Sequence, residues 1–150
     1  STPNATHLIK IASQAVVGIR DHIEIFGEDY DTPDGTCVRD YIHVTDLAAA
    51  HVDALRHLRD GGGGLTLNCG YGRGYSVREV LHAVEQATGR SLDIRSAPRR
   101  AGDAETLVAN AGEIKKRFGW RPRYNDLDLI VQTAIDWEKK LSGQAGSGSA

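Results

Sequence analysis

Two arginine sites carry the clearest chemical signal in the sequence. Arg39 stands where a polar loop leads into an apolar stretch, and Arg99 and Arg100 lie in a loop that also holds Asp103. A guanidinium group binds phosphate oxygens through paired hydrogen bonds, and a nearby carboxylate can accept hydrogen bonds from ribose hydroxyls. The pattern indicates a nucleotide phosphate site, but ion pairs of Arg39 with Asp40 or of Arg100 with Asp103 would use the same residues.

A glycine-rich stretch at residues 70–74, Gly-Tyr-Gly-Arg-Gly, lies between a candidate strand and a candidate helix. The start of a helix can bind phosphate, and Asp93 lies about 20 residues on, where a dinucleotide fold places its ribose-binding acid. However, Tyr75 or Val77 stands where the third glycine of that motif belongs, and Asp93 falls inside a predicted strand. We interpret the stretch as a turn that leads into a helix.

Metal and nucleophile chemistry finds little support in the sequence. His43, Asp46 and His51 do not have the i, i+4 histidine spacing of a zinc helix, and the Gly-x-Ser-x-Gly motif of hydrolases is absent. Cys37 and Cys69 are too few for a zinc knuckle or a disulfide framework. We expect two free thiols in a reducing, cytoplasmic compartment and no metal site.

Apolar residues at helical spacing predict the helices that would position these groups. Thr6 and Thr45 are expected to cap the first two helices, while Ser76 and Glu79 form a capping box for the third, which Gly89 ends. The helices are expected at residues 8–19, 45–58, 77–88, 113–118 and 127–141.

Stretches rich in β-branched or alternating residues predict short strands between the helices. The strands are expected at residues 23–26, 38–44, 65–69 and 92–96, and the polar segments 27–36 and 98–103 are expected to be loops. This mixture indicates an α/β fold. The elements do not alternate regularly enough for a complete doubly wound sheet.

Length and charge limit the class of protein. A chain of 150 residues can form one domain that buries roughly 70% of its unfolded surface. A net charge of −2 excludes a broad basic surface, so we expect no nucleic-acid partner. Without an apolar run of ~18 residues or a charged-then-apolar leader, we expect no membrane span and no signal peptide. Residues 1–141 form the expected domain, and 142–150 a flexible Gly/Ser-rich tail.

The most specific motif is Asp34-Gly-Thr-Cys-Val-Arg-Asp-Tyr-Ile-His-Val44. Further motifs are His-Leu-Ile at 7–9, Asn-Cys-Gly-Tyr-Gly-Arg-Gly-Tyr-Ser-Val at 68–77, Pro-Arg-Arg-Ala-Gly-Asp at 98–103 and Gly-Trp-Arg-Pro at 119–122. With these motifs in this order, the chain resembles the C-terminal half of UDP-glucose 4-epimerases, which are extended short-chain dehydrogenases/reductases. The resemblance covers residues 5–140. It implies a small mixed α/β substrate-binding domain without the N-terminal Rossmann domain.

The resemblance also implies a UDP-sugar site with a role for each residue. Arg39 and Arg100 would hold the diphosphate, Asp103 the ribose, and the backbone from Glu24 to Phe26 the uracil. The remaining implied residues line the site or limit the room for the sugar: His7, Leu8, Tyr41, Val77 and Leu107. Leu107 falls where the family sets the space for the C2 substituent, and its medium size leaves N-acetylated sugars undecided.

Four positions depart from the family pattern. Lys10 replaces a usual proline, Cys37 a usual small residue, Cys69 a usual leucine and Asn110 a usual aspartate. None of the four is an implied phosphate ligand, so the departures leave the expected nucleotide site intact.

The resemblance implies an isomerase of galactose metabolism that uses NAD to epimerise C4 of a UDP-hexose through a 4-keto intermediate. Catalysis in that family needs a Tyr-x-x-x-Lys pair and an NAD-binding glycine motif, both in the N-terminal half. None of the five tyrosines here is followed four residues later by lysine. We therefore expect no catalytic residue and no cofactor in this chain, no activity from it alone, and weak UDP-sugar binding if it is isolated.

Two other hypotheses stay open. The chain could be a stand-alone module that binds nucleotide sugars or self-associates without catalysis, because an uncovered domain interface favours oligomers. It could instead belong to a nucleotide-sugar dehydratase or decarboxylase, although the Asp-Gly-Thr stretch argues against that reading. The partner of the chain would accordingly be a UDP-sugar together with a missing N-terminal half or a second copy.

Overall fold

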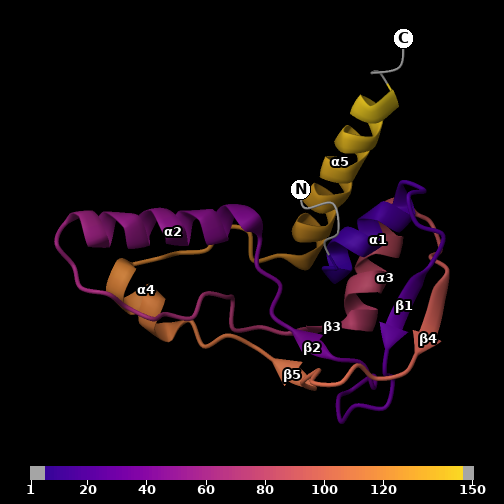
Figure 1. Ribbon diagram of the computed structural model, residues 1–150, viewed down its shortest axis with the longest axis horizontal. Coiled ribbons are helices and arrows are strands. Elements are labelled where there is room, and N and C mark those ends of the chain that lie inside the picture. Colours follow the sequence, from indigo (N-terminus) through magenta and orange to yellow (C-terminus); the bar gives the residue numbers. More distant parts are fainter. Residues whose placement is uncertain (1–5, 147–150) are drawn as a thin grey trace.

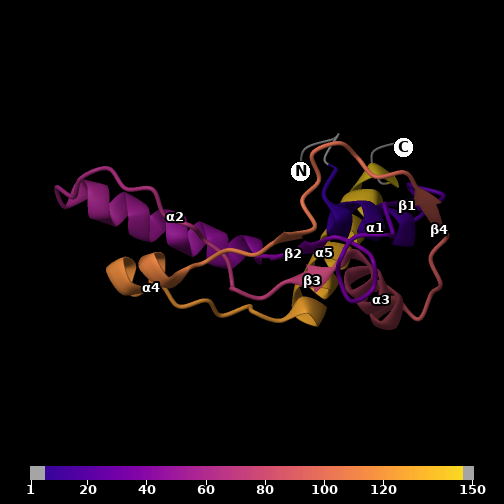
Figure 2. The same cartoon turned by 90° about the horizontal axis from the view of Figure 1, so that it is seen from below.

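The structure, a computed structural model, describes residues 6–146. Its helices within this range are α1 (Leu8–Val16), α2 (Val44–Arg59), α3 (Val77–Thr88), α4 (Gly112–Phe118) and α5 (Leu127–Gly146). Its strands are β1 (Ile23–Phe26), β2 (Val38–Arg39), β3 (Tyr75–Ser76), β4 (Ile94–Ala97) and β5 (Thr106–Leu107). The predicted α/β class is confirmed. Figures 1 and 2 show a body of α1, α3, α5, β1 and β4, from which an arm of α2 and α4 projects.

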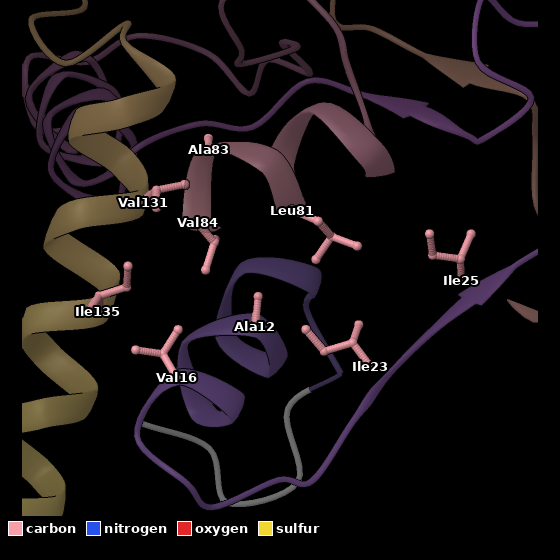
Figure 3. Close-up of a cluster of buried hydrophobic side chains, with 9 residues drawn as sticks. All are labelled: Ala12, Val16, Ile23, Ile25, Leu81, Ala83, Val84, Val131 and Ile135. Atoms are coloured by element: carbon pink, nitrogen blue, oxygen red, sulfur yellow. The ribbon is translucent and has the colours of Figure 1, made fainter. Parts of the chain in front are cut away.

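The core of the body lies between three helices and one strand (Figure 3). In β1, the buried Ile23 and Ile25 alternate with Glu24 and Phe26, which lie on the other face of the strand. The strand pairs in parallel with β4, from Ile23 opposite Ile94 to Phe26 opposite Ala97. The buried side chains of the three helices complete the core: Ala12, Val16, Leu81, Ala83, Val84, Val131 and Ile135.

Helix caps confirm one local prediction and correct two. Ser76 Oγ accepts from the Glu79 N–H, and the Glu79 carboxylate accepts from the Ser76 N–H, so the capping box that starts α3 is present. The predictions for Thr6 and Thr45 were wrong. The N-cap of α1 is His7, and the N-cap of α2 is His43, whose Nδ1 accepts from the Thr45 N–H.

The body and the arm are joined by a small sheet with the strand order β3-β2-β5. The predicted strand at 38–44 was too long, because only two residues of β2 pair with neighbours. Beyond them, Asp40 uses its carboxylate to accept the N–H groups of Tyr71, Gly72 and Ala109. The chain then turns directly into α2 at Val44.

The arm has its own small cluster of buried residues, in which Tyr71, Ile114 and Trp120 lie with Ala50, Ala111 and Ile130. The predicted strand at 65–69 was wrong, because no strand of the described residues pairs with it. The opposite side of α2 is open: Val44 is 72% exposed and Leu55 66% exposed. Exposed apolar residues on one helix face indicate a surface that can pack against another element.

The last helix runs to Gly146, five residues past the expected end of the folded region at Leu141. Residues 147–150 of the expected tail lie outside the described residues. No helix between residues 6 and 146 combines the length and the apolarity that a bilayer crossing requires.

Candidate functional site

A cavity of about 860 Å³ opens beside β1, between the start of α1 and the loops that follow β2 and β4. It brings together nine of the ten residues that the sequence singled out. They are His7 and Leu8 at the start of α1, Glu24 and Phe26 in β1, Arg39 and Tyr41 in and after β2, Val77 in α3, and Arg100 and Asp103 in the loop after β4. Leu107 is not among its lining residues; it lies in β5, opposite Arg39, with an exposed side chain.

Arg39 reaches the cavity from the central sheet. Its Nη1 donates to the carbonyl of Val38 at 2.8 Å and to that of Glu105 at 3.4 Å. The anticipated ion pair with Asp40 is not formed, because that carboxylate accepts backbone N–H groups instead. Since carbonyl groups rather than a carboxylate hold it, the Arg39 guanidinium can still bind an anion in the cavity.

Arg100 lines the same cavity from the loop after β4. Its guanidinium carbon lies 4.4 Å from the centre of the Phe26 ring, and its Nε donates to Asp103 Oδ2 at 3.0 Å. The predicted ion pair of Arg100 with Asp103 is therefore present, and both of its members line the cavity. Because an arginine carries five donors, a single bond to Asp103 leaves others for a further acceptor.

The backbone of β1 offers hydrogen-bonding groups to the cavity. The N–H groups of Ile23 and Gly27 donate to β4 and the residues that flank it. Because backbone groups alternate between the two edges of a strand, those of Glu24 and Phe26 point to the other edge. No other strand of the described residues pairs with β1. This edge can therefore bind a planar ring that carries both a donor and acceptors.

Tyr41 contributes a neutral hydroxyl to the cavity wall. Burial raises its pKa to about 12, although the nearby Arg39 acts in the opposite direction. The phenol therefore stays protonated at neutral pH. It can donate a hydrogen bond to a ligand, but it is a poor candidate for a general base.

Several lining residues had not been singled out as site residues. They include the polar run Arg20, Asp21 and His22 just before β1, and Cys37, which precedes β2. Arg20 is held by a 2.8 Å bond from its Nε to Gln14 of α1. The cluster of three polar residues at the entry to a buried strand was a signal in the sequence, but nothing local showed that α1 would fold beside it.

The glycine-rich stretch is explained by packing rather than by a dinucleotide. A Cβ atom on Gly70 would lie 2.5 Å from Ala109 Cβ and 2.6 Å from Asp40 Oδ2, and one on Gly74 would lie 2.4 Å from Val38 Cγ1. Asp93 forms an ion pair with Arg95 on the surface. Close packing accounts for these glycines without a bound dinucleotide. Residues 6–146 contain no metal-binding group of three or more His, Cys, Asp or Glu residues.

Comparisons with known proteins show which proteins this chain resembles. A family model described as "NAD dependent epimerase/dehydratase family" matches residues 2–70. A UDP-glucose 4-epimerase from Azospirillum brasilense is 57% identical over the whole chain, and one from Rhizobium meliloti is 48% identical over 90% of it. The chain spans only 44% and 41% of the length of these relatives.

Solved structures give the same result. The UDP-glucose 4-epimerase of Bifidobacterium longum, determined in complex with NAD⁺ and UDP, is 38% identical, with a TM-score of 0.86 over 93% of this chain and 41% of its own. The enzyme of Brucella ovis, determined with NAD, is 48% identical, with a TM-score of 0.82 over 89% of this chain and 41% of its own. Over its whole length the chain is thus similar to UDP-glucose 4-epimerases, and it matches the C-terminal portion of their structures.

Proposed function

We propose that the cavity binds the UDP part of a nucleotide sugar, and that the chain is the substrate-binding part of a UDP-hexose 4-epimerase. One observation carries this proposal: Arg39 and Arg100, far apart in the sequence, line one cavity together with Asp103. Two guanidinium groups in one cavity match the two phosphates of a diphosphate, because each can make paired charged hydrogen bonds.

The other lining residues fit the remaining parts of the ligand. Asp103 would accept from the ribose hydroxyls while it stays paired with Arg100. The free backbone edge at Glu24 and Phe26 would read the uracil. His7, Leu8, Tyr41 and Val77 would line the remaining walls, and Leu107 would act only beyond the cavity, toward the sugar.

The chemistry of epimerisation lies outside the described residues in this proposal. NAD, which the relatives from Brucella ovis and Bifidobacterium longum hold, accepts and returns a hydride when it is bound. We propose that the portion of those enzymes that this chain does not span holds the NAD. The described residues bind and orient the substrate, and the 150-residue chain alone is inactive.

Calorimetry with UDP tests the proposal on the full gene product, meaning this chain together with the portion of the epimerases that it does not span. Arg39→Ala and Arg100→Ala should each weaken UDP binding by roughly tenfold or more, since each removes charged hydrogen bonds worth about 1.5–3 kcal/mol. Arg117→Ala is the matched control, because Arg117 forms an exposed ion pair with Glu113 on α4, away from the cavity. Unchanged UDP affinity in both cavity variants would refute the proposal.

A second proposal concerns the partner that covers the arm. It rests on the exposed apolar side of α2 and on segment 65–69, which forms no strand with the described residues. We propose that this surface packs against the portion of the epimerases that this chain does not span, and that a second copy of the chain covers it when the chain is isolated. The stand-alone binding module of the sequence hypotheses would use the same surface for self-association.

A further inference from the structure

Two adjacent arginines in the loop after β4 have different surroundings. Arg100 lines the cavity, whereas Arg99 is not among its lining residues. The Arg99 guanidinium turns toward the loop after β1: its Nε donates to Asp29 Oδ1 at 2.6 Å, and its Nη2 donates to the Asp29 carbonyl. Its guanidinium carbon also lies 4.0 Å from the centre of the Tyr30 ring.

The loop that receives Arg99 is firmly held. Tyr30 is 5% exposed, and its N–H donates to the Gly35 carbonyl at 3.0 Å. Asp34 Oδ1 accepts from the N–H and the hydroxyl of Thr36, at 2.9 and 2.7 Å. The other carboxylate oxygen of Asp34 accepts from the hydroxyl of Ser76, the N-cap of α3. The loop is thereby tied to a helix of the core, so it can serve as a fixed point.

The aliphatic part of the Arg99 side chain is also closely packed. A Cβ atom on Gly27 would lie 2.6 Å from Arg99 Cγ and 2.6 Å from Tyr30 Cε2, and Gly27 has a φ of +86°. The Gly27 N–H donates to the Ala97 carbonyl at 2.9 Å, where β1 and β4 end side by side. Arg99 is therefore held by its ion pair with Asp29 and by contacts with the Tyr30 ring and Gly27. The next residue, Arg100, lines the cavity.

We propose that Arg99 is a positioning residue for nucleotide binding: it fixes the loop after β4 so that Arg100 and Asp103 face the cavity. The inference deepens the proposed function and rests on it. Misplacing a positioned group by about 1 Å can lower a catalytic rate by up to about 100-fold. Small displacements of Arg100 should likewise weaken nucleotide binding, so the loop need not unfold for binding to suffer.

The solvent exposure of the Arg99–Asp29 ion pair lets an experiment distinguish positioning from a contribution to fold stability. The side chains of Arg99 and Asp29 are 43% and 78% exposed. Ion pairs as exposed as this one contribute little to the stability of the fold. Loss of Arg99 should therefore change the affinity for UDP and leave the melting temperature nearly unchanged.

The test is calorimetry with UDP on the full gene product, together with thermal melting. Arg99→Ala should weaken UDP binding roughly tenfold while the melting temperature stays within ~2 °C of the wild type. Asp29→Asn, which removes the partner and keeps the Arg99 charge, should also weaken binding. Arg95→Ala is the matched control, because Arg95 forms a similar exposed ion pair with Asp93 near the same strand but does not line the cavity.

Arg99→Lys separates positioning from plain electrostatic attraction. Lysine keeps the positive charge but loses the two-pronged bond to Asp29 and the flat contact with Tyr30. Positioning predicts that Arg99→Lys recovers only part of the lost affinity. Full recovery, or wild-type affinity in Arg99→Ala, would overturn the inference.

The outcome for Arg100→Ala distinguishes the two proposals. If Arg100→Ala weakens UDP binding and Arg99→Ala does not, the positioning role is wrong and the nucleotide site stands. If neither variant changes UDP binding, the proposed nucleotide site itself is wrong.

Discussion

The hydroxyl of Tyr71 donates a 2.6 Å hydrogen bond to Asp46 Oδ2, and both side chains are buried. Asp46 lies in the first turn of α2, and its carboxylate also accepts the N–H groups of Arg123 and Tyr124 at 2.9–3.1 Å. Trp120 adds a bond from its indole N–H to the Asp46 carbonyl at 3.1 Å. One carboxylate therefore joins the arm to the segment that connects α4 and α5.

Asp46→Asn should destabilise the fold markedly. The asparagine side chain keeps the size of aspartate, but its amide group would place N–H donors against backbone donors. Because Asp46 is only 2% exposed, we expect a loss of about 2–4 kcal/mol in the free energy of unfolding at pH 7. Urea denaturation measures it. Asp53→Asn, which removes an exposed ion pair with Arg56 in the same helix, is the control and should cost less than about 1 kcal/mol.

The same group predicts how stability depends on pH. Burial opposes ionisation of Asp46, but the Tyr71 hydroxyl and the two backbone N–H groups outweigh it and lower the pKa of Asp46 below its ordinary value of 3.8. A carboxyl with a depressed folded pKa stabilises the fold above its unfolded pKa and loses that contribution as pH falls through the folded value. The stability gap between wild type and Asp46→Asn should stay constant above about pH 5 and shrink below about pH 4. A gap that widens in acid would contradict this assignment.

Glycine substitutions test whether the 70–74 stretch serves packing. Gly70→Ala and Gly74→Ala should lower the melting temperature, because the new Cβ would lie within 2.6 Å of neighbouring side chains. We expect a cost of about 1–3 kcal/mol for each, as in other overpacked sites. Gly63→Ala is the control, since no atom lies within 4 Å of its Cβ position. Equal melting temperatures for all three variants would reopen the question of what these glycines do.

Local rules were sufficient where neighbours in the sequence decide the structure. The capping box at Ser76 and the alternation in β1 needed only residues a few positions apart. The same rules overestimated strands. Residues 65–69 have β-prone side chains, but a strand needs a partner, and the described residues offer none.

Long-range contacts also limited how much of the candidate site could be predicted from the sequence. The meeting of Arg39 and Arg100 at one cavity followed from the resemblance, not from their spacing. The contact of Arg99 with Asp29 joins residues 70 positions apart, and no local pattern indicated it. The burial of Asp46 was equally hidden, because its donors lie at Tyr71, Arg123 and Tyr124.

The open side of α2 predicts self-association of the isolated 150-residue chain. Val52 and Leu55 stand three positions apart on this helix, so they share a face, and both are exposed. The double variant Val52→Glu/Leu55→Glu should convert an oligomer into a monomer of 16.2 kDa in light scattering. Leu129→Glu, at an exposed leucine of α5, is the control and should leave the oligomer intact.

The same double variant distinguishes the two occupants of this surface in the full gene product. If the portion of the relatives that this chain does not span covers α2, two buried glutamates should lower the free energy of unfolding by about 2 kcal/mol or more, because unpaired charges are costly to bury. If a second copy covers it, the variant should change the oligomeric state and leave monomer stability nearly unchanged. A wild-type 150-residue chain that stays monomeric at high concentration would refute self-association, because an apolar helix face of this kind would then be tolerated in water.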